Sequence, residues 1–302
     1  MTPASGNLSW LEASARQRLA AFVDLGSFAE FIGPEQRELS PHLGLFDLPE
    51  QFDDGMIVGR AALGGTEVFV AAQEGRFMGG AIGEVHGAKL AGLLRAAAQL
   101  RRDVLILLDT GGVRLQEANA GELAIGEIIR AIVELRRGGN RVIGLIGGRA
   151  GGYGGGGLIA GCCSTLIVSE QGRISVSGPE VIETNMGVEE FDSRDRALVW
   201  RTMGGKHRYL IGGADMFVED DPDAFRQAAL AALHRPARLE LTTLQAEQQR
   251  LERRLQRFGD ARDGTDIWSA LGIGDPETIP GLACDEFHRQ AVDCRETADD
   301  AR

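Results

Sequence analysis

Cysteine is scarce in this sequence of 302 residues. It occurs as Cys162, Cys163, Cys284 and Cys294, and no two of these form the C-x-x-C pair with which structural zinc sites commonly begin. We interpret the four as reduced thiols of a cytoplasmic protein, because disulfides persist mainly in oxidising compartments. The cysteines therefore predict no metal site.

Long apolar runs and an excess of positive charge are also missing. The formal net charge is −12, whereas a nucleic-acid binder needs a basic surface to meet phosphates. Residues 1–25 carry polar and acidic positions throughout, unlike the apolar region of a signal peptide. The stretch of lowest charge, residues 142–168, is interrupted by Arg149 and many glycines, which argues against a membrane span. These absences predict a soluble protein with small-molecule or protein partners.

What the sequence does contain is an alternation of strands and helices. Residues 103–109 and 141–146 are continuous apolar runs of strand length, as expected when both faces of a sheet are covered. Between them, residues 122–137 repeat apolar side chains at the spacing of a buried helix face. Such alternation implies a largely parallel sheet with right-handed crossovers.

Shorter elements are predicted around this alternation. A hairpin of two strands turns at Gly64 and Gly65, where paired glycines favour a tight turn. The other predicted elements are the hairpin strands 56–63 and 67–72, a helix over 84–101, and strands over 164–168 and 173–176.

After Pro236 the sequence becomes rich in Glu, Gln, Arg and Leu. Its apolar residues fall near heptad spacing at Leu241, Leu244, Leu251, Leu255 and Phe258, with Gln248 in the gap. A long helix that packs against the rest of the protein and a dedicated coiled-coil arm both explain this pattern, and we favour the packing helix. Residues 236–302 are thus predicted to form a helical extension that ends in a polar tail.

Two of the buried strands end in glycine clusters, each followed by a predicted helix. They are residues 111–114 (GGVR) and 147–157 (GGRAGGYGGGG). Glycine lets a backbone N–H group approach a ligand closely, and N–H groups before a helix form a natural anion site. Relief of crowding would explain one cluster, but two in equivalent positions favour a functional site.

The second cluster also matches a dinucleotide-binding fingerprint. Gly152, Gly154 and Gly157 have G-x-G-x-x-G spacing, and Glu170 ends the next predicted strand. However, only six residues separate Gly157 from Ser164, which we consider too few for the crossover helix of a Rossmann unit. The fingerprint is therefore the weaker interpretation.

Three segments resemble a known family. Residues 110–117 (TGGVRLQE) resemble the S-G-G-A-R-x-Q-E signature of acyl-CoA carboxyltransferases, a branch of the crotonase-like superfamily. Residues 77–89 (FMGGAIGEVHGAK) and 161–184 resemble two further motifs of those enzymes. Together with the SFAEF, SPHLG and DDG elements near the N-terminus, the set most closely resembles the β subunits of biotin-independent malonate decarboxylases, over roughly residues 20–235.

This resemblance implies an α/β crotonase-like fold, a spiral of repeated ββα units, with helical extensions at both ends. We expect the core at residues 55–235, after a helical and loop-rich lead-in at 1–54. The β subunit of acetyl-CoA carboxylase carries a four-cysteine zinc ribbon at its N-terminus, whereas no cysteine precedes Cys162 here. That difference, together with the expanded glycine run around Tyr153, favours the decarboxylase.

The resemblance also implies a reaction. A malonyl thioester on the phosphopantetheine arm of an acyl carrier protein would lose CO2, with no biotin, metal or other cofactor bound by this chain. Two backbone donors would stabilise the oxygen of the resulting enolate. We expect one oxyanion hole at Gly111 and Gly112, a second at Gly151, Gly152 and either Tyr153 or Gly154, and substrate contacts from Val113, Arg114, Gln116 and Glu117.

In the resembled family the active site lies between related subunits, so a homologous γ subunit and the acyl carrier protein are the expected partners. Candidates for protonating the enolate are Glu117, Tyr153 and His86, each of which also has a structural explanation. Arg114 either orients its loop or a carboxylate, or forms a plain ion pair. A local basic cluster either binds the carrier protein or forms a solvated face of ion pairs. It comprises Arg194, Arg196, Arg201, Lys206, His207 and Arg208.

Two other functions stay open at this stage. One is that of a carboxyltransferase subunit of an acyl-CoA carboxylase, which biotin dependence would reveal. A non-catalytic scaffold subunit is the third interpretation. Two donor-rich glycine loops argue against the scaffold, because a scaffold needs no such donors.

Overall fold

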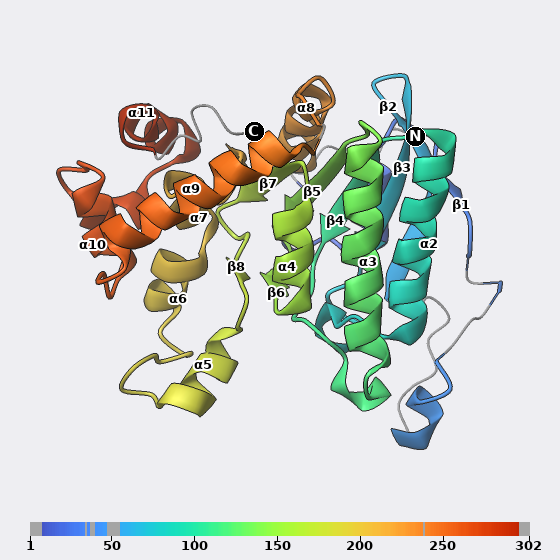
Figure 1. Cartoon of the computed structure of the whole chain (residues 1–302), viewed down its shortest axis with the longest axis horizontal. Helices are drawn as coiled ribbons and strands as arrows, with labels where there is room; N and C mark the ends of the chain where they lie inside the picture. The colour runs from blue at the N-terminus through green and yellow to red at the C-terminus, as the bar shows by residue number, and fades with distance from the viewer. Residues whose placement is uncertain (1–7, 34, 37–39, 47–54, 238, 296–302) are drawn as a thin grey trace.

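A seven-stranded sheet in the order β1-β2-β3-β4-β5-β7-β9 runs through the protein (Figure 1). The computed structural model describes residues 8–33, 35–36, 40–46, 55–237 and 239–295. The β1-β2 and β2-β3 pairs are antiparallel and every later pair is parallel. The strands are β1 Ala29–Glu30, β2 Met56–Leu63, β3 Thr66–Gln73, β4 Val104–Leu108, β5 Val142–Ile146, β7 Thr165–Ser169 and β9 Met216–Val218.

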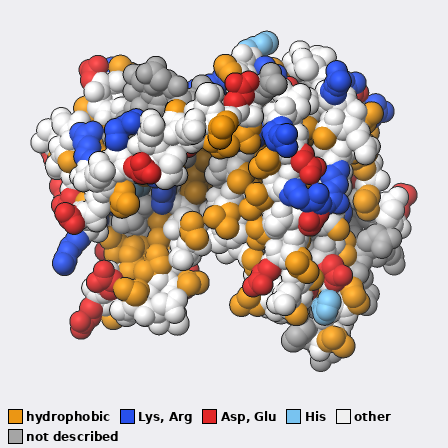
Figure 2. All heavy atoms as spheres, viewed as in Figure 1, with side chains coloured by type: hydrophobic (Ala, Val, Ile, Leu, Met, Phe, Trp, Pro, Cys, Tyr) orange, Lys and Arg blue, Asp and Glu red, His pale blue; other side chains and the backbone are white. Residues whose placement is uncertain are grey.

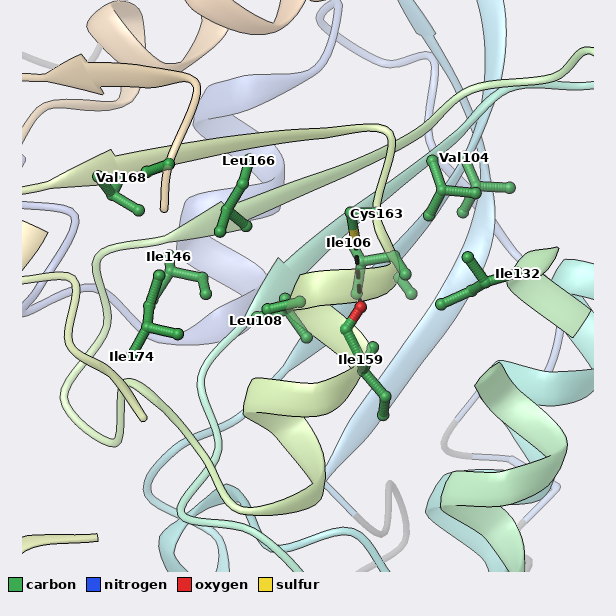
Figure 3. Close-up of a cluster of buried hydrophobic side chains, with 14 of the residues drawn as sticks. Val104, Ile106, Leu108, Ile132, Ile146, Ile159, Cys163, Leu166, Val168 and Ile174 are labelled. Atoms are coloured by element: carbon green, nitrogen blue, oxygen red, sulfur yellow. Dashed lines mark hydrogen bonds between the residues drawn. The ribbon is translucent and has the colours of Figure 1, made fainter. Parts of the chain in front are cut away.

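Helices cover both faces of this sheet. On one face lie α2 (Glu84–Leu100), α3 (Ala120–Arg137) and α4 (Gly155–Cys162), as Figure 1 shows. Ile132 and Ile159 from these helices meet strand side chains such as Ile106 in one buried cluster (Figure 3). Burial of such side chains supplies the main drive for this packing.

The opposite face is covered by α1 (Ala15–Phe22) and α8 (Pro222–Ala232). Trp10, just before α1, stacks on Phe225 of α8 with ring centroids 4.2 Å apart. A capping box at Ser14 starts α1, which satisfies backbone donors that the first turn leaves free. The N-terminal helix therefore packs against α8 as well as against the sheet.

The remaining helices follow the sheet on one side of the molecule (Figure 1). They are α5 Pro179–Met186, α6 Arg196–Met203, α7 Gly205–Leu210, α9 Leu241–Phe258, α10 Gly264–Ala270 and α11 Cys284–Cys294. Elsewhere in the described ranges, short 3-10 helices occur at Leu43–Phe46, Met78–Gly80, Leu115–Glu117 and Pro276–Gly281. Within the described ranges, no helix combines the length and the apolar character that a membrane crossing requires.

The mixed α/β class and the mostly parallel sheet confirm the prediction from the alternating pattern. The hairpin turn, the three long strands of the parallel part and helices α2 and α3 begin and end within about two residues of their predicted bounds. These elements were predictable because a strand buried on both faces and an amphipathic helix each leave a local signature.

The second glycine cluster differs from the prediction of one long loop. Gly152–Tyr153 forms strand β6, and the last three glycines of the cluster, 155–157, are the first turn of α4. Strand β8 (Ile174–Ser175) pairs with β6 rather than with β7. The crossover between β5 and β7 is the eight-residue helix α4, which lies where the sequence predicted a helix after the glycine cluster.

Helix α9 also differs from expectation, because most of its heptad leucines do not pack inside this chain. Leu241, Leu244 and Leu255 are 70%, 50% and 71% exposed. The buried residues of α9 are Arg250 and Phe258. Of the predicted heptad positions, Phe258 is therefore buried in this chain, whereas the leucines before it are largely exposed. The predicted polar tail beyond Arg295 lies outside the described residues.

Candidate active site

The two glycine loops lie side by side at the ends of β4 and β5. The N–H of Thr110 donates to the carbonyl of Gly151 (2.8 Å), and the N–H of Tyr153 donates to the carbonyl of Thr110 (2.9 Å). A Cβ added at Gly154 would lie 3.3 Å from the Cα of Gly112. The structure thus brings the predicted glycines of both loops into a single cluster.

Several of the predicted donors are already engaged within the protein. The N–H of Gly111 donates to the carbonyl of Gly79 at 2.8 Å, and that of Gly152 donates to the carbonyl of Arg173 at 2.8 Å. The N–H of Gly112 donates to Thr110 Oγ1 at 3.1 Å. A donor held by an internal acceptor has no lone N–H to offer a substrate. These N–H groups therefore shape the loops.

Other N–H groups of the two loops bond no acceptor among the described residues, including that of Gly151, a predicted donor. Those of Val113 and Gly154 are two of them. The carbonyl of Gly112 and the N–H of Arg114 both bond Ile82. Because backbone groups alternate along an extended segment, the N–H of Val113 points to the side opposite Ile82. Gly154, with φ +55°, directly precedes α4, where N–H groups and the helix dipole favour negative charge. Both residues are half-buried.

Thr110 holds the first loop in shape, a role that the sequence reasoning missed. Its hydroxyl accepts the N–H of Gly112 and donates to the carbonyl of the same residue at 3.3 Å. The signal was present, since Thr110 occupies the Ser position of the resembled signature. Gly112 needs this support because its φ of +126° lies in a region that only glycine adopts easily.

The side chains of Arg114 and Glu117 point into the protein interior rather than toward solvent. Their side chains are fully buried and joined by an ion pair of 2.7 Å. Arg114 also donates to the carbonyl of Ala81 at 3.0 Å, and Glu117 accepts the N–H of Glu84 at the start of α2. We predicted that these two side chains contact the substrate. Their contacts instead hold the first glycine loop in place. Gln116, by contrast, is exposed.

The three candidate proton donors have different surroundings. Glu117 is engaged as described, and His86 is fully buried with its Nε2 3.1 Å from Nε2 of Gln73. Tyr153 packs against Val199 and Met203 of α6. Burial raises the pKa of the Tyr153 phenol, which Arg173 opposes, and its hydroxyl has no hydrogen-bond partner in the described part of the chain. Tyr153 therefore keeps its proton at neutral pH.

A hollow separates the α5–α6 side of the molecule from α3 and α4, with apolar side chains on both sides (Figure 2). Exposed apolar residues are frequent on the elements that border it, and they include Leu115, Leu123, Leu158, Val176, Val181, Met186 and Val188. Apolar surface concentrated in this way is typical of a protein interface or a ligand site.

Most side chains of the predicted basic cluster form contacts within the protein. Arg201 pairs with Asp263 at 2.9 Å, and Lys206 contacts Glu170 at 3.3 Å. Burial lowers the pKa of His207 to about 3, with Arg208 acting in the same direction. Of the six residues in this cluster, Arg194 and Arg196 are exposed. In the described ranges, no group of three or more His, Cys, Asp or Glu side chains is arranged to hold a metal ion.

Comparison with known proteins gives consistent matches. The family model of the carboxyl transferase domain matches residues 12–249. The malonyl-S-ACP:biotin-protein carboxyltransferase MADC of Malonomonas rubra is 40% identical over 305 residues, covering 94% of this chain and 95% of that protein.

Among solved structures, a chain of a Pseudomonas malonate decarboxylase hetero-tetramer in complex with malonate is 40% identical with a TM-score of 0.77. The match covers 86% of this chain and 95% of that chain. A chain of the Pseudomonas malonate decarboxylase MdcD-MdcE hetero-dimer is 38% identical with a TM-score of 0.64, over 83% and 97% of the two chains.

Proposed function

This chain belongs to the carboxyl transferase domain family, with its crotonase-like fold, and from that premise we propose that it is the β-type subunit of a malonate decarboxylase. The observation that carries the proposal is the meeting of two glycine loops that leaves the N–H groups of Val113 and Gly154 without an internal acceptor. Two backbone donors aimed at one oxygen would stabilise the negative charge that this oxygen gains.

The reaction follows from that pair of donors. The carbonyl oxygen of a malonyl thioester lies between Val113 N–H and Gly154 N–H. The bond between C2 and the carboxylate breaks, CO2 leaves, and the electron pair forms the enolate, whose oxygen becomes an oxyanion. Each donor contributes about 3 kcal/mol to the transition state. A proton added to C2 then gives the acetyl thioester.

A partner subunit completes this site. The hollow beside the loops is open and has apolar residues at its borders, and the Pseudomonas relatives are a hetero-tetramer and a hetero-dimer. We infer that a homologous γ subunit covers the hollow and that an acyl carrier protein delivers the thioester. Exclusion of water by the partner would strengthen both N–H contacts with the oxyanion.

Transfer of the carboxyl group to biotin is the second candidate function. The relative from Malonomonas rubra, equally similar in sequence, is a malonyl-S-ACP:biotin-protein carboxyltransferase. That reaction needs the same enolate, and differs only in whether CO2 is released or carried away on biotin.

One assay separates the two functions. The chain is purified with its partner and given malonyl-carrier protein, and CO2 and acetyl-carrier protein are measured with avidin present. Decarboxylation predicts full turnover under these conditions and after chelator treatment. Carboxyl transfer predicts no turnover until a biotinyl protein is added without avidin. Full turnover by the isolated chain would contradict the need for the partner.

A further inference from the structure

Asp109 lies at the end of β4, directly before the first glycine loop, and is 1% exposed. Its Oδ2 accepts a hydrogen bond from Arg18 Nη1 at 2.7 Å, and its Oδ1 accepts one from the N–H of Ala150 at 2.6 Å. Ala150 belongs to the second glycine loop. One carboxylate thus joins the start of the first loop to the middle of the second.

Neighbouring backbone and side-chain groups confine the Asp109 carboxylate. The N–H of Asp109 donates to Gln73 Oε1 at 2.9 Å. A Cβ at Gly148 would collide with the carboxylate, so the second loop passes against it without a side chain between them. Contacts from both sides therefore determine where Ala150, and the loop that follows it, can lie.

Arg18 makes a buried charge at position 109 tolerable. It is 2% exposed, and its Nε also donates to the carbonyl of Trp10 at 2.7 Å. A buried carboxylate without a partner is strongly unfavourable, whereas a paired one is tolerated. Because an ionised acceptor forms the stronger hydrogen bond, the pair also tightens the contact with Ala150.

We propose that Asp109 is a positioning residue that fixes the second glycine loop against the first, and so sets the spacing between the N–H groups of Val113 and Gly154. Its effect on rate rests on the proposed function, but its effect on the loop does not. If the Arg18–Asp109 pair served the fold alone, the bond to Ala150 would be dispensable.

The test uses Asp109→Asn in the chain assembled with its partner. The neutral amide cannot serve both donors, so kcat on malonyl-carrier protein falls by about tenfold to a hundredfold with KM within about threefold. Amide hydrogen exchange of residues 147–154 accelerates. A kcat within about threefold of the parent, or unchanged exchange in that segment, overturns the proposal.

Asp103→Asn is the matched control. Asp103 lies just before the other end of β4 and likewise accepts a backbone N–H and a guanidinium, both from Arg141, at 2.7 and 3.2 Å. Because it lies away from the glycine loops, its substitution leaves kcat and the exchange of residues 147–154 unchanged. Equal effects of the two variants would overturn the proposal.

A double variant decides the matter if Asp109→Asn does not fold. Arg18→Met with Asp109→Leu removes both charges and keeps similar volumes, a change that proteins often accept. We expect it to assemble, with slow turnover and fast exchange in residues 147–154. Normal turnover, or failure to assemble, would assign the pair to the fold alone. If the parent complex does not decarboxylate, the proposed function fails while the exchange measurement still tests the positioning.

Discussion

At the scale of single residues, Gly154 is the position where the two loops touch. Its φ is +55°, and a Cβ there would press on Gly112 at 3.3 Å. Alanine at positive φ costs about 1 kcal/mol, so Gly154→Ala should relax the loops apart. We expect kcat to fall by about tenfold to a hundredfold while the complex still assembles.

Gly161→Ala is the control for this substitution, since Gly161 lies in α4, the helix that Gly154 precedes. An added Cβ there would meet no heavy atom of the described residues within 4 Å beyond its chain neighbours and the backbone of its own helix. It should leave kcat unchanged. Steady-state kinetics and melting temperatures of both variants in the complex provide the measurement. A Gly154→Ala complex with normal kcat would show that the contact between the loops has no part in turnover.

Thr110 offers a second test at this scale. Valine keeps its volume but leaves the N–H of Gly112 without the acceptor that it has at 3.1 Å. The loss of a buried acceptor costs about 1–3 kcal/mol, so Thr110→Val should lower both the free energy of unfolding and kcat. Thr110→Ser keeps the hydroxyl and should behave as the parent. The idea fails if the valine and serine variants are indistinguishable by denaturant unfolding and kinetics.

Among the elements, those with a local sequence pattern could be predicted, and contacts between distant segments could not. The apolar run of β4 and the amphipathic face of α3 identified these elements, and glycines after β4 and β5 indicated the candidate site. The sequence did not reveal that β8 pairs with β6 or that the N–H of Gly112 is held by Thr110. Both depend on contacts between loops distant in the chain, which leave no periodic signature.

The exposed leucine seam of α9 allows a test of how this chain binds its partner subunits. Because Leu244 and Leu255 are 50% and 71% exposed, changing both to Glu should hardly alter the melting temperature of the isolated chain. We expect the double variant to lose binding to the partner subunits, since charges at a heptad core are unfavourable.

The matched control is Gln249→Glu with Gln256→Glu, which adds the same charge to exposed positions outside the seam. Binding measured by analytical ultracentrifugation should survive in this control. Unchanged assembly of the leucine variant would mean that the seam lies outside the interface.

At the scale of the whole molecule, His207 should make stability depend on pH. Its folded pKa is about 3, because of burial and the nearby cations Arg208 and Arg254, against an ordinary value of 6.5. Between these values the unfolded chain binds the extra proton, so the stability contribution is present above about pH 6.5 and is lost as pH falls.

Denaturant unfolding at pH 7.5 and 5.5 measures this effect. The free energy of unfolding of the parent should drop by about 1.4 kcal/mol more than that of His207→Gln over this interval. An identical drop in the two proteins would contradict a buried, neutral His207.

Stabilisation of a thioester enolate by two backbone donors of this chain can be measured directly, without decarboxylation. In D2O, the assembled complex should exchange the methyl hydrogens of acetyl-carrier protein through the same enolate, as mass spectrometry can follow. Gly154→Ala should slow this exchange by the same factor as it slows decarboxylation. Absence of exchange in the parent complex, or full exchange in a Gly154→Ala complex that no longer decarboxylates, would contradict this stabilisation.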